Sequence, residues 1–120
     1  MAFDLVVKRI YESPAPDDGQ RVLVDRVWPR GVRKEHAALS LWLKEIAPSE
    51  DLRKWFGHEP ERWAEFQRRY RAELDGNGEA VAQLRGLLGK GKVTLLYGAH
   101  DEVHNNAVVL AGYLSARAHN

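Results

Sequence analysis

A run of five residues near the end of the chain, 93–97 (VTLLY), constrains the fold most. It is almost wholly apolar and lies between Gly91 and Gly98. An uninterrupted apolar run of this length is typical of a strand that is buried on both faces, and such strands belong to parallel sheets with both faces covered. The run therefore predicts an α/β protein built around a covered parallel sheet.

Two further segments have the composition of strands. Residues 3–11 are rich in valine, isoleucine and aromatic residues, and residues 13–19, with two prolines and a glycine, are predicted to form the loop that follows. Residues 41–47 (LWLKEIA) are too short for a confident helix and are flanked by Ser40 and Pro48. We interpret them as a strand or an irregular extended segment.

Residues 21–27 (RVLVDRV) are predicted to be a strand with Val22 and Val24 on one face and Leu23 and Asp25 on the other. A carboxylate late in a strand is costly to bury without a partner, and a neighbouring arginine is the partner we expect. The following WPRG sequence ends the strand, because Pro29 has no N–H to give to a sheet ladder.

Helical periodicity marks the remaining segments. Residues 33–40 can form one or two turns, and Ser49 is a suitable cap for a helix that ends at Gly57. A longer helix is predicted to start at Pro60, a third to end near Gly89, and a last one to begin near residue 104 or 105. The core stripe of the longer helix consists of Trp63, Phe66, Tyr70 and Leu74.

The alternation of strands and helices predicts one α/β domain over residues 1–120. We expect a small three-layer or two-layer sandwich with a mostly parallel sheet of about four strands and about four to five helices. In such sheets, ligands bind at the carboxyl ends of the strands. The segments after residues 27 and 97 are therefore the places to look for a site.

Composition excludes several classes of protein. The chain has no cysteine, which excludes disulfide frameworks, thiolate metal sites and cysteine nucleophiles, and suits a reducing cytoplasm. Its 18 basic and 17 acidic residues give a net charge of +1, so a polyanion grip by the whole chain is not supported. No segment has the features of a membrane span or a signal peptide. We expect a cytoplasmic protein with no membrane partner, and the sequence does not define its oligomeric state.

The segment after the apolar run, which we call the histidine bend (residues 98–106), concentrates polar chemistry. A strand-to-helix turn presents free backbone N–H groups that can hold a phosphate or carboxylate. Imidazole titrates near neutral pH and can act as a general acid or base, which a carboxylate can orient. The candidate catalytic residues are His100, His104, Asp101 and Glu102, and Asn105 and Asn106 are candidate ligand-binding residues.

A structural reading of the same bend stays open. In it, Asp101 or Asn105 caps the helix and the histidines pack or face water. The i, i+4 spacing of His100 and His104 resembles a zinc pair, but Gly98 and the acidic residues between them suggest that His100 precedes the helix. We therefore assign no metal and no cofactor.

The second candidate is the arginine bend (residues 25–34, DRVWPRGVRK). Arg26, Arg30 and Arg33 can hold an anionic group through their guanidinium forks, and Trp28 can stack on a base or sugar. Asp25 is included as a ligand-binding residue. The structural alternative is that Arg26 pairs with Asp25 or with an acidic helix residue and that Trp28 belongs to the core.

The remaining basic and aromatic residues have simpler explanations. The arginines of the long helix alternate with glutamates, which is typical of a solvated face with i, i+4 ion pairs. We interpret Trp42, Trp55 and Trp63 as packing residues. Of the three, Trp42 is the strongest candidate for a role other than packing.

The motifs DRVWPRG and DEVHN, with the segments around them, resemble the YeaO-like family, a small bacterial family of unknown function. The resemblance covers essentially the whole chain and implies an α/β cytoplasmic domain with no established activity. Longer and more distant relatives have a cysteine at the end of the last strand and a C-x-R element in the next turn. This chain has Tyr97 and residues 105–107 (NNA) there, so the resemblance implies no thiol chemistry.

The sequence leaves two functions open. In the first, the protein binds a small anionic ligand, bearing a phosphate or carboxylate and including nucleotides, with His-assisted hydrolysis or transfer; whether it is an enzyme is undecided. In the second, the WPRGVRK loop serves a non-catalytic module that binds nucleic acid or protein, and nucleic acid is the less favoured partner. The first function requires the two bends to face a common hollow.

Overall fold

The computed structural model describes residues 4–117, and its centre is a sheet of four parallel strands in the order β1-β4-β2-β3. The strands are β1 (Leu5–Arg9), β2 (Gln20–Leu23), β3 (Leu41–Trp42) and β4 (Val93–Tyr97). All five residues of β4 are buried, and β4 pairs with β1 on one side and β2 on the other. The predicted buried strand is confirmed, and so is the parallel α/β class.

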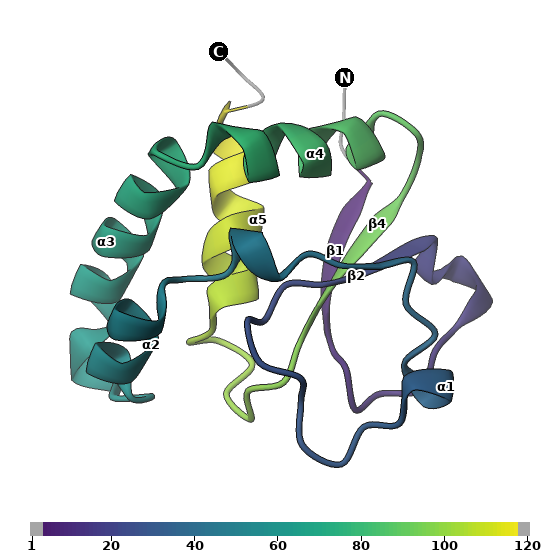
Figure 1. The fold of residues 1–120 in the computed structure, drawn as a ribbon, viewed down its shortest axis with the longest axis horizontal. Coiled ribbons are helices and arrows are strands. Elements are labelled where there is room, and N and C mark those ends of the chain that lie inside the picture. The colour runs from purple at the N-terminus through teal and green to yellow at the C-terminus, as the bar shows by residue number, and fades with distance from the viewer. Residues whose placement is uncertain (1–3, 118–120) are drawn as a thin grey trace.

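Five α-helices and three short 3-10 helices complete the described chain. The four longer helices lie on one side of the sheet (Figure 1): α2 (Glu50–Phe56), α3 (Trp63–Asp75), α4 (Gly78–Leu88) and α5 (Asn106–Arg117). Of these, α5 contacts β1 and β4, and all four contribute to one core with this first face of the sheet. The short α1 (Lys34–Ala37) lies with the loops on the other side of the sheet. The 3-10 helices are η1 (Pro16–Asp18), η2 (Lys44–Ile46) and η3 (Pro60–Arg62). No helix among residues 4–117 has the length and apolar character that a membrane span requires.

The alternation along the strands divides the core into two parts. Val22 and Val24 share one face, as predicted, and belong to the core that includes the four longer helices, whereas Leu23 faces the other side. There Leu23 and Leu96 pack with Ile10 and Ala37, and the partly buried Trp28, Val32, Leu39 and Trp42 surround them. The second face is thus covered by loops and one short helix, a thinner layer than the helices on the first face.

The helices begin and end where local chemistry predicts. The hydroxyl of Ser49 accepts a hydrogen bond from the N–H of Leu52, and α2 ends at Gly57 with a left-handed φ of 52°. Pro60 opens a 3-10 turn rather than the long helix itself, and α3 follows from Trp63. The last helix begins at Asn106, one or two residues later than predicted.

Three predicted strands end earlier than the sequence suggested. The strand predicted over residues 21–27 ends at Leu23, and only the N–H of Val24 continues the pairing, to the carbonyl of Leu96. The segment 41–47 supplies two strand residues and then turns into a 3-10 helix. The strand predicted over residues 3–11 begins outside the described residues, and its described part pairs from Leu5 to Arg9.

A buried ionic network joins the strands beneath the second face. The carboxylate of Asp18 accepts hydrogen bonds from Lys8 Nζ (3.0 Å) and Arg21 Nη1 (2.5 Å), and Arg21 also donates to the carbonyl of Ala37. Burial by itself raises the pKa of Asp18, but the hydrogen bonds from the N–H of Ala15, from Lys8 and from Arg21 outweigh it and lower the pKa to about 2. The network therefore stabilises the fold only while Asp18 is ionised.

We expect Asp18→Asn to lower the free energy of unfolding by about 2 kcal/mol at pH 7, the value of a pKa lowered from 3.8 to about 2. Because the folded-state pKa is the lower one, this contribution is complete above pH 3.8 and is lost as the pH falls toward 2. Urea unfolding from pH 2 to pH 7 measures the difference. The neighbouring exposed Asp17→Asn is the matched control, and equal losses in the two variants would contradict the network.

Candidate functional site

The two bends lie against each other at the carboxyl ends of the strands. The N–H of Gly98 donates to Asp25 Oδ2 at 2.9 Å. A Cβ added to Gly98 would be 3.2 Å from that oxygen and 3.3 Å from Pro29 Cβ, so the absence of a side chain permits the close approach. The arginine bend and the histidine bend therefore touch at the strand ends, whereas the common hollow expected between them is a separate matter.

Asp25 is bonded differently from the expectation. Its carboxylate makes no ion pair with an arginine among residues 4–117; it accepts instead from Gly98, and the side chain of Asn106 also hydrogen-bonds to it. Burial raises the pKa of Asp25, against these two hydrogen bonds and the nearby charges of His58 and Arg53. A neutral amide N–H replaces the arginine because the strand has already ended and the chain turns toward Gly98.

Arg26 has a structural task. Its Nε donates to the carbonyl of Pro48 and its Nη2 to the carbonyl of Ala47, both at 3.1 Å, so it holds the segment that leads into α2. It forms neither of the ion pairs considered from the sequence within the described residues. The role of Arg26 as an anion ligand stays a prediction. These two hydrogen bonds leave fewer guanidinium N–H groups available to bind an anion.

Arg30 and Arg33 are exposed, and no side-chain hydrogen bond or ion pair occupies either guanidinium within residues 4–117. The carbonyl of Arg30 accepts a hydrogen bond from the hydroxyl of Tyr11, which fixes the bend but not the side chain. Both cations therefore remain able to meet an external anion.

Trp28 and Trp42 form an aromatic pair on the second face. Their ring centroids are 5.3 Å apart at an interplanar angle of 70°, an edge-to-face arrangement. Each indole nitrogen donates to a backbone carbonyl, Trp28 to Val32 and Trp42 to Asp25, both at 2.7 Å. Both rings are partly buried, so Trp28 is a packing residue and still reaches the surface.

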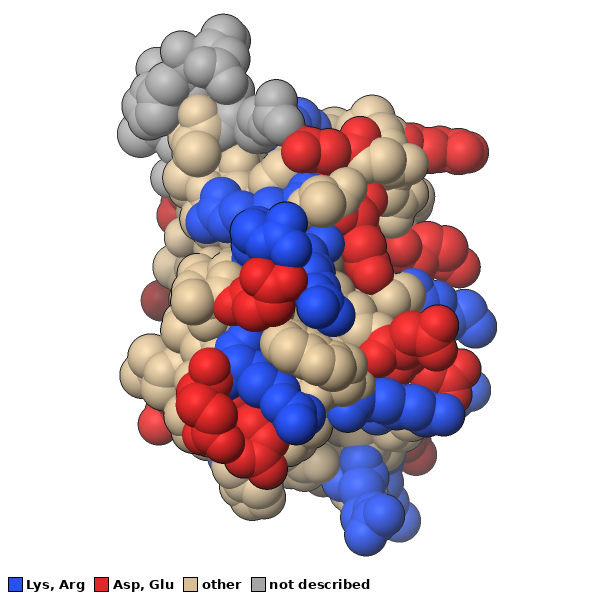
Figure 2. Space-filling model, turned by 90° about the vertical axis from the view of Figure 1, so that its left-hand side faces the viewer, with Lys and Arg blue, Asp and Glu red and all other residues tan. Residues whose placement is uncertain are grey.

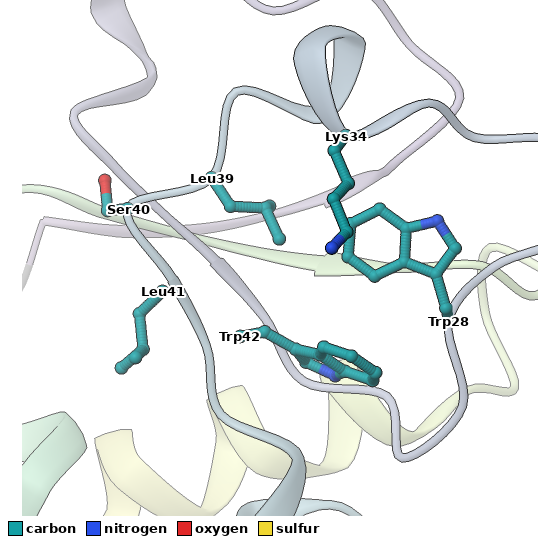
Figure 3. A pocket seen from close by; sticks show the side chains of 6 residues that line it. All are labelled: Trp28, Lys34, Leu39, Ser40, Leu41 and Trp42. Carbon is teal, nitrogen blue, oxygen red and sulfur yellow. The ribbon is translucent and has the colours of Figure 1, made fainter.

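Beside this pair lies an open hollow of about 440 Å³, which we call the tryptophan hollow. Figure 3 shows Lys34 extending from α1 toward the two indoles, with the side chains of Leu39 and Leu41 on the other side. The ammonium of Lys44 lies 5.0 Å from the centroid of the Trp42 ring. The lining residues are Trp28, Lys34, Leu39, Ser40, Leu41 and Trp42.

The hollow corrects one expectation. Two of its lining residues, Trp28 and Lys34, come from the arginine bend, and none comes from the histidine bend. The bends touch through Asp25, Pro29 and Gly98, but they do not jointly line this hollow. Sequence reasoning included Lys34 in the arginine bend without placing it among the ligand-binding residues, and it named Trp42 as the first exception to packing. It missed Leu39, Ser40 and Leu41, because only folding brings β3 beside the arginine bend.

On the histidine bend, Asp101 orients His104. Asp101 Oδ2 lies 2.8 Å from His104 Nδ1, and Oδ1 accepts from the N–H groups of Val103 and His104. These hydrogen bonds lower the pKa of Asp101 to about 2. The imidazole meets the edge of Trp63 with centroids 5.0 Å apart. The carboxylate at Nδ1 and the Trp63 edge together fix the orientation of the imidazole ring.

The other polar residues of this bend divide between structure and surface. Asn105 is buried and caps α5: its Oδ1 accepts from the N–H of Val108, and its Nδ2 donates to the carbonyl of Asp101. Asn106 donates to the carbonyl of Val24 at 2.9 Å and so ties α5 to the end of β2. His100 and Glu102 are exposed. The capping alternative therefore describes Asn105, whereas catalytic roles for His100, Asp101, Glu102 and His104 stay predictions.

Two other site types receive no support. No group of three or more histidine, aspartate or glutamate side chains among residues 4–117 is arranged to hold a metal ion. On the face that carries α3, basic and acidic side chains interleave (Figure 2), and Glu65 pairs with both Arg68 and Arg69. This is the mixed surface predicted for the long helix, without the single-sign patch of a nucleic-acid interface.

We expect Asp25→Asn to raise the free energy of unfolding at pH 7. The asparagine oxygen can still accept from Gly98, while the unfavourable burial of a charge is removed. Because burial raises the folded-state pKa of Asp25, the wild-type penalty is absent below the unfolded pKa and grows as the pH rises through the folded one. Thermal unfolding of both proteins between pH 3 and pH 7 measures this, and a variant less stable than wild type at pH 7 would contradict it.

Known proteins resemble the chain over nearly its whole length. Residues 4–120 match the family DUF488-N3i, described as the "Inactive DUF488-N3 subclade". An uncharacterised protein of Mycobacterium tuberculosis is 47% identical over 111 residues, which cover 92% of this chain and 93% of that relative. The uncharacterised protein YeaO of Escherichia coli is 44% identical over 107 residues, 89% of this chain and 93% of the relative.

No solved structure matches the chain at a significant level. The resemblance to the YeaO-like family, first drawn from the DRVWPRG and DEVHN motifs, is confirmed by these relatives. The chain therefore belongs to the DUF488-N3i family, the inactive DUF488-N3 subclade, whose bacterial relatives named above are uncharacterised proteins.

Proposed function

We propose that the protein is a non-catalytic binding protein that holds a small anionic ligand with a planar ring in the tryptophan hollow. The observation that supports this most is the presence of two indoles and one lysine ammonium around the same space of about 440 Å³. Aromatic faces and a cation are the two features that a ring-bearing phosphate or carboxylate needs.

The ring of the ligand would be held by stacking and apolar contact. In the edge-to-face pair, one indole presents its edge to the face of the other, so a ligand ring would stack on a face that this contact leaves open. Leu39 and Leu41 add apolar lining. Stacking of a base on an aromatic side chain contributes about 1–3 kcal/mol. A hollow of about 440 Å³ is in the size range of small-ligand sites and suits a ligand of mononucleotide size.

The anionic group would be held by Lys34, whose side chain extends toward the indoles (Figure 3). Arg33 precedes Lys34 in the chain and has an unoccupied guanidinium within residues 4–117. Charge on the ligand is thus met locally, consistent with a net charge of only +1. A single small anion fits this arrangement better than a long polyanion.

A binding role is favoured over catalysis by two observations. The family is described as inactive. The Asp101–His104 pair, which has the geometry of an oriented base, is absent from the lining of the hollow. The absence of cysteine suits a reducing compartment, and we propose that the protein acts in the cytoplasm.

Adenosine 5′-monophosphate is the probe that tests this proposal by calorimetry. We expect Lys34→Gln to weaken its binding about fivefold, the effect of losing one partly exposed charge contact of about 1 kcal/mol. Lys90→Gln removes an exposed lysine from the loop before β4 and serves as the matched control, which we expect to bind like wild type. If the two variants bind the probe with equal affinity, Lys34 does not contribute to the site.

The same titrations with adenosine and with inorganic phosphate separate the contributions of ring and anion. We expect each to bind more weakly than the complete probe, because each engages half of the lining. A single-stranded oligothymidylate tests the alternative nucleic-acid function. Tighter binding of the oligonucleotide, steeply dependent on salt and abolished by Arg30→Ala with Arg33→Ala, would favour that alternative and overturn the small-ligand proposal.

A further inference from the structure

Both indoles of the tryptophan hollow depend on one short segment, residues 24–32. Trp28 is part of it, and its indole nitrogen donates to the carbonyl of Val32 within it. Trp42 comes from another strand, but its indole nitrogen donates to the carbonyl of Asp25 at 2.7 Å. The positions of both rings therefore follow the position of the chain around Asp25.

That segment lies beyond the end of β2 and is fixed from the side of the histidine bend. Asp25 Oδ2 accepts the N–H of Gly98, and Pro29 packs where a Gly98 side chain would otherwise lie. Asn106 adds a third contact, donating to the carbonyl of Val24. The carboxylate of Asp25 is thus the one ionisable group among these contacts between the two bends.

The surroundings of the carboxylate determine its charge. From α2 and the turn after it, Arg53 and His58 favour the ionised form; from the histidine bend, Gly98 and Asn106 contribute neutral hydrogen-bond donors. Farther along that bend, Asp101 and His104 bind each other. Burial is the dominant influence and raises the pKa of Asp25. Keeping Asp25 ionised therefore costs the fold free energy, and a group with such a perturbed pKa is typical of functional sites.

We propose that Asp25 is a positioning residue for the tryptophan hollow and that uptake of a proton by Asp25 lowers the affinity of the hollow for its ligand. This inference rests on the proposed function of the hollow. Protonation removes the negative charge that strengthens the hydrogen bond from the Gly98 N–H to Asp25. The segment around Asp25, whose carbonyl binds the Trp42 indole, is then held less firmly. The ligand itself need not contact Asp25.

Nuclear magnetic resonance of the ligand-free, ¹⁵N-labelled protein tests the coupling directly. The cross-peaks followed between pH 3.5 and pH 8 are the Gly98 amide and the Trp42 indole N–H, the latter assigned by its loss in Trp42→Phe. We expect the two to shift with one common midpoint above 3.8, the ordinary pKa of an aspartate. In Asp25→Asn both shifts should vanish, while the indole of Trp55, on α2, follows neither.

His58→Gln is the second variant, because the imidazole is a charge that favours ionised Asp25. Its removal should move the common midpoint to higher pH without abolishing it. A Trp42 indole that does not move with Gly98, or that titrates unchanged in Asp25→Asn, would overturn the proposal. A midpoint that disappears in His58→Gln would assign the titration to His58 and overturn it equally.

Affinity for adenosine 5′-monophosphate supplies the functional readout. The ratio of the wild-type and Asp25→Asn dissociation constants cancels the titration of the probe's own phosphate. As the pH falls through the midpoint, we expect wild type to weaken about threefold relative to the variant, the size of one weakened hydrogen bond. A constant ratio would refute the link to affinity. If the wild type does not bind the probe at any pH, the hollow fails as the site, and the indole titration alone then decides whether Asp25 positions Trp42.

Discussion

The burial of β4 is the constraint on which the rest of the structure depends. Its five residues are shielded on both faces, and both of its edges are paired. A strand in this position requires one layer of cover on each side, since apolar surface left in water costs about 25 cal/mol per Å². The four longer helices supply the first layer, and the arginine bend, α1 and their neighbours supply the second.

The difference between a helical layer on one side of the sheet and a loop layer on the other explains why the hollow lies on the loop-covered side. Helices pack apolar stripes closely into the core on their side of the sheet, as Phe66, Tyr70 and Leu74 of α3 do. A loop cover has no such periodic stripe, and here the aromatic side chains of Trp28 and Trp42 fill the space instead. Two large rings that meet edge to face close the core and still leave an open, partly apolar space beside them.

The strand ends show how a polar cluster can be shared between scaffold and site. Arg26 and Asn105 make bonds to the backbone that replace lost secondary-structure hydrogen bonds, and Asn106 ties a helix start to a strand end. Arg30 and Arg33 make no such bonds among residues 4–117 and stay exposed. A motif in the sequence therefore does not act as one unit. A polar residue takes a structural role where an unpaired backbone group lies within reach of its side chain, and it stays exposed where none does.

Local patterns were sufficient for the parts of the fold that depend on neighbours in the chain. The run 93–97, the stripe of α3, the cap at Ser49 and the stop at Gly57 are properties of a few consecutive residues, and the structure has each of them. The Asp101–His104 contact is also local, at a separation of three residues, and is one of the carboxylate–imidazole pairings that the sequence left open. The meeting of the two bends followed from the rule that parallel strands end at one edge.

Partners distant in the sequence were decided by the tertiary structure alone. Asp25 is bonded to Gly98, 73 residues away, and to the Trp42 indole, 17 residues away, while Asn106 reaches Val24 across 82 residues. No spacing in the sequence specifies these choices, because a buried polar group takes whichever donor or acceptor the packed chain brings within about 3 Å. The sequence thus determined the strands, the helices and the edge at which they end. Packing decided which side chains there bond to the protein's own backbone and which stay exposed or line the tryptophan hollow.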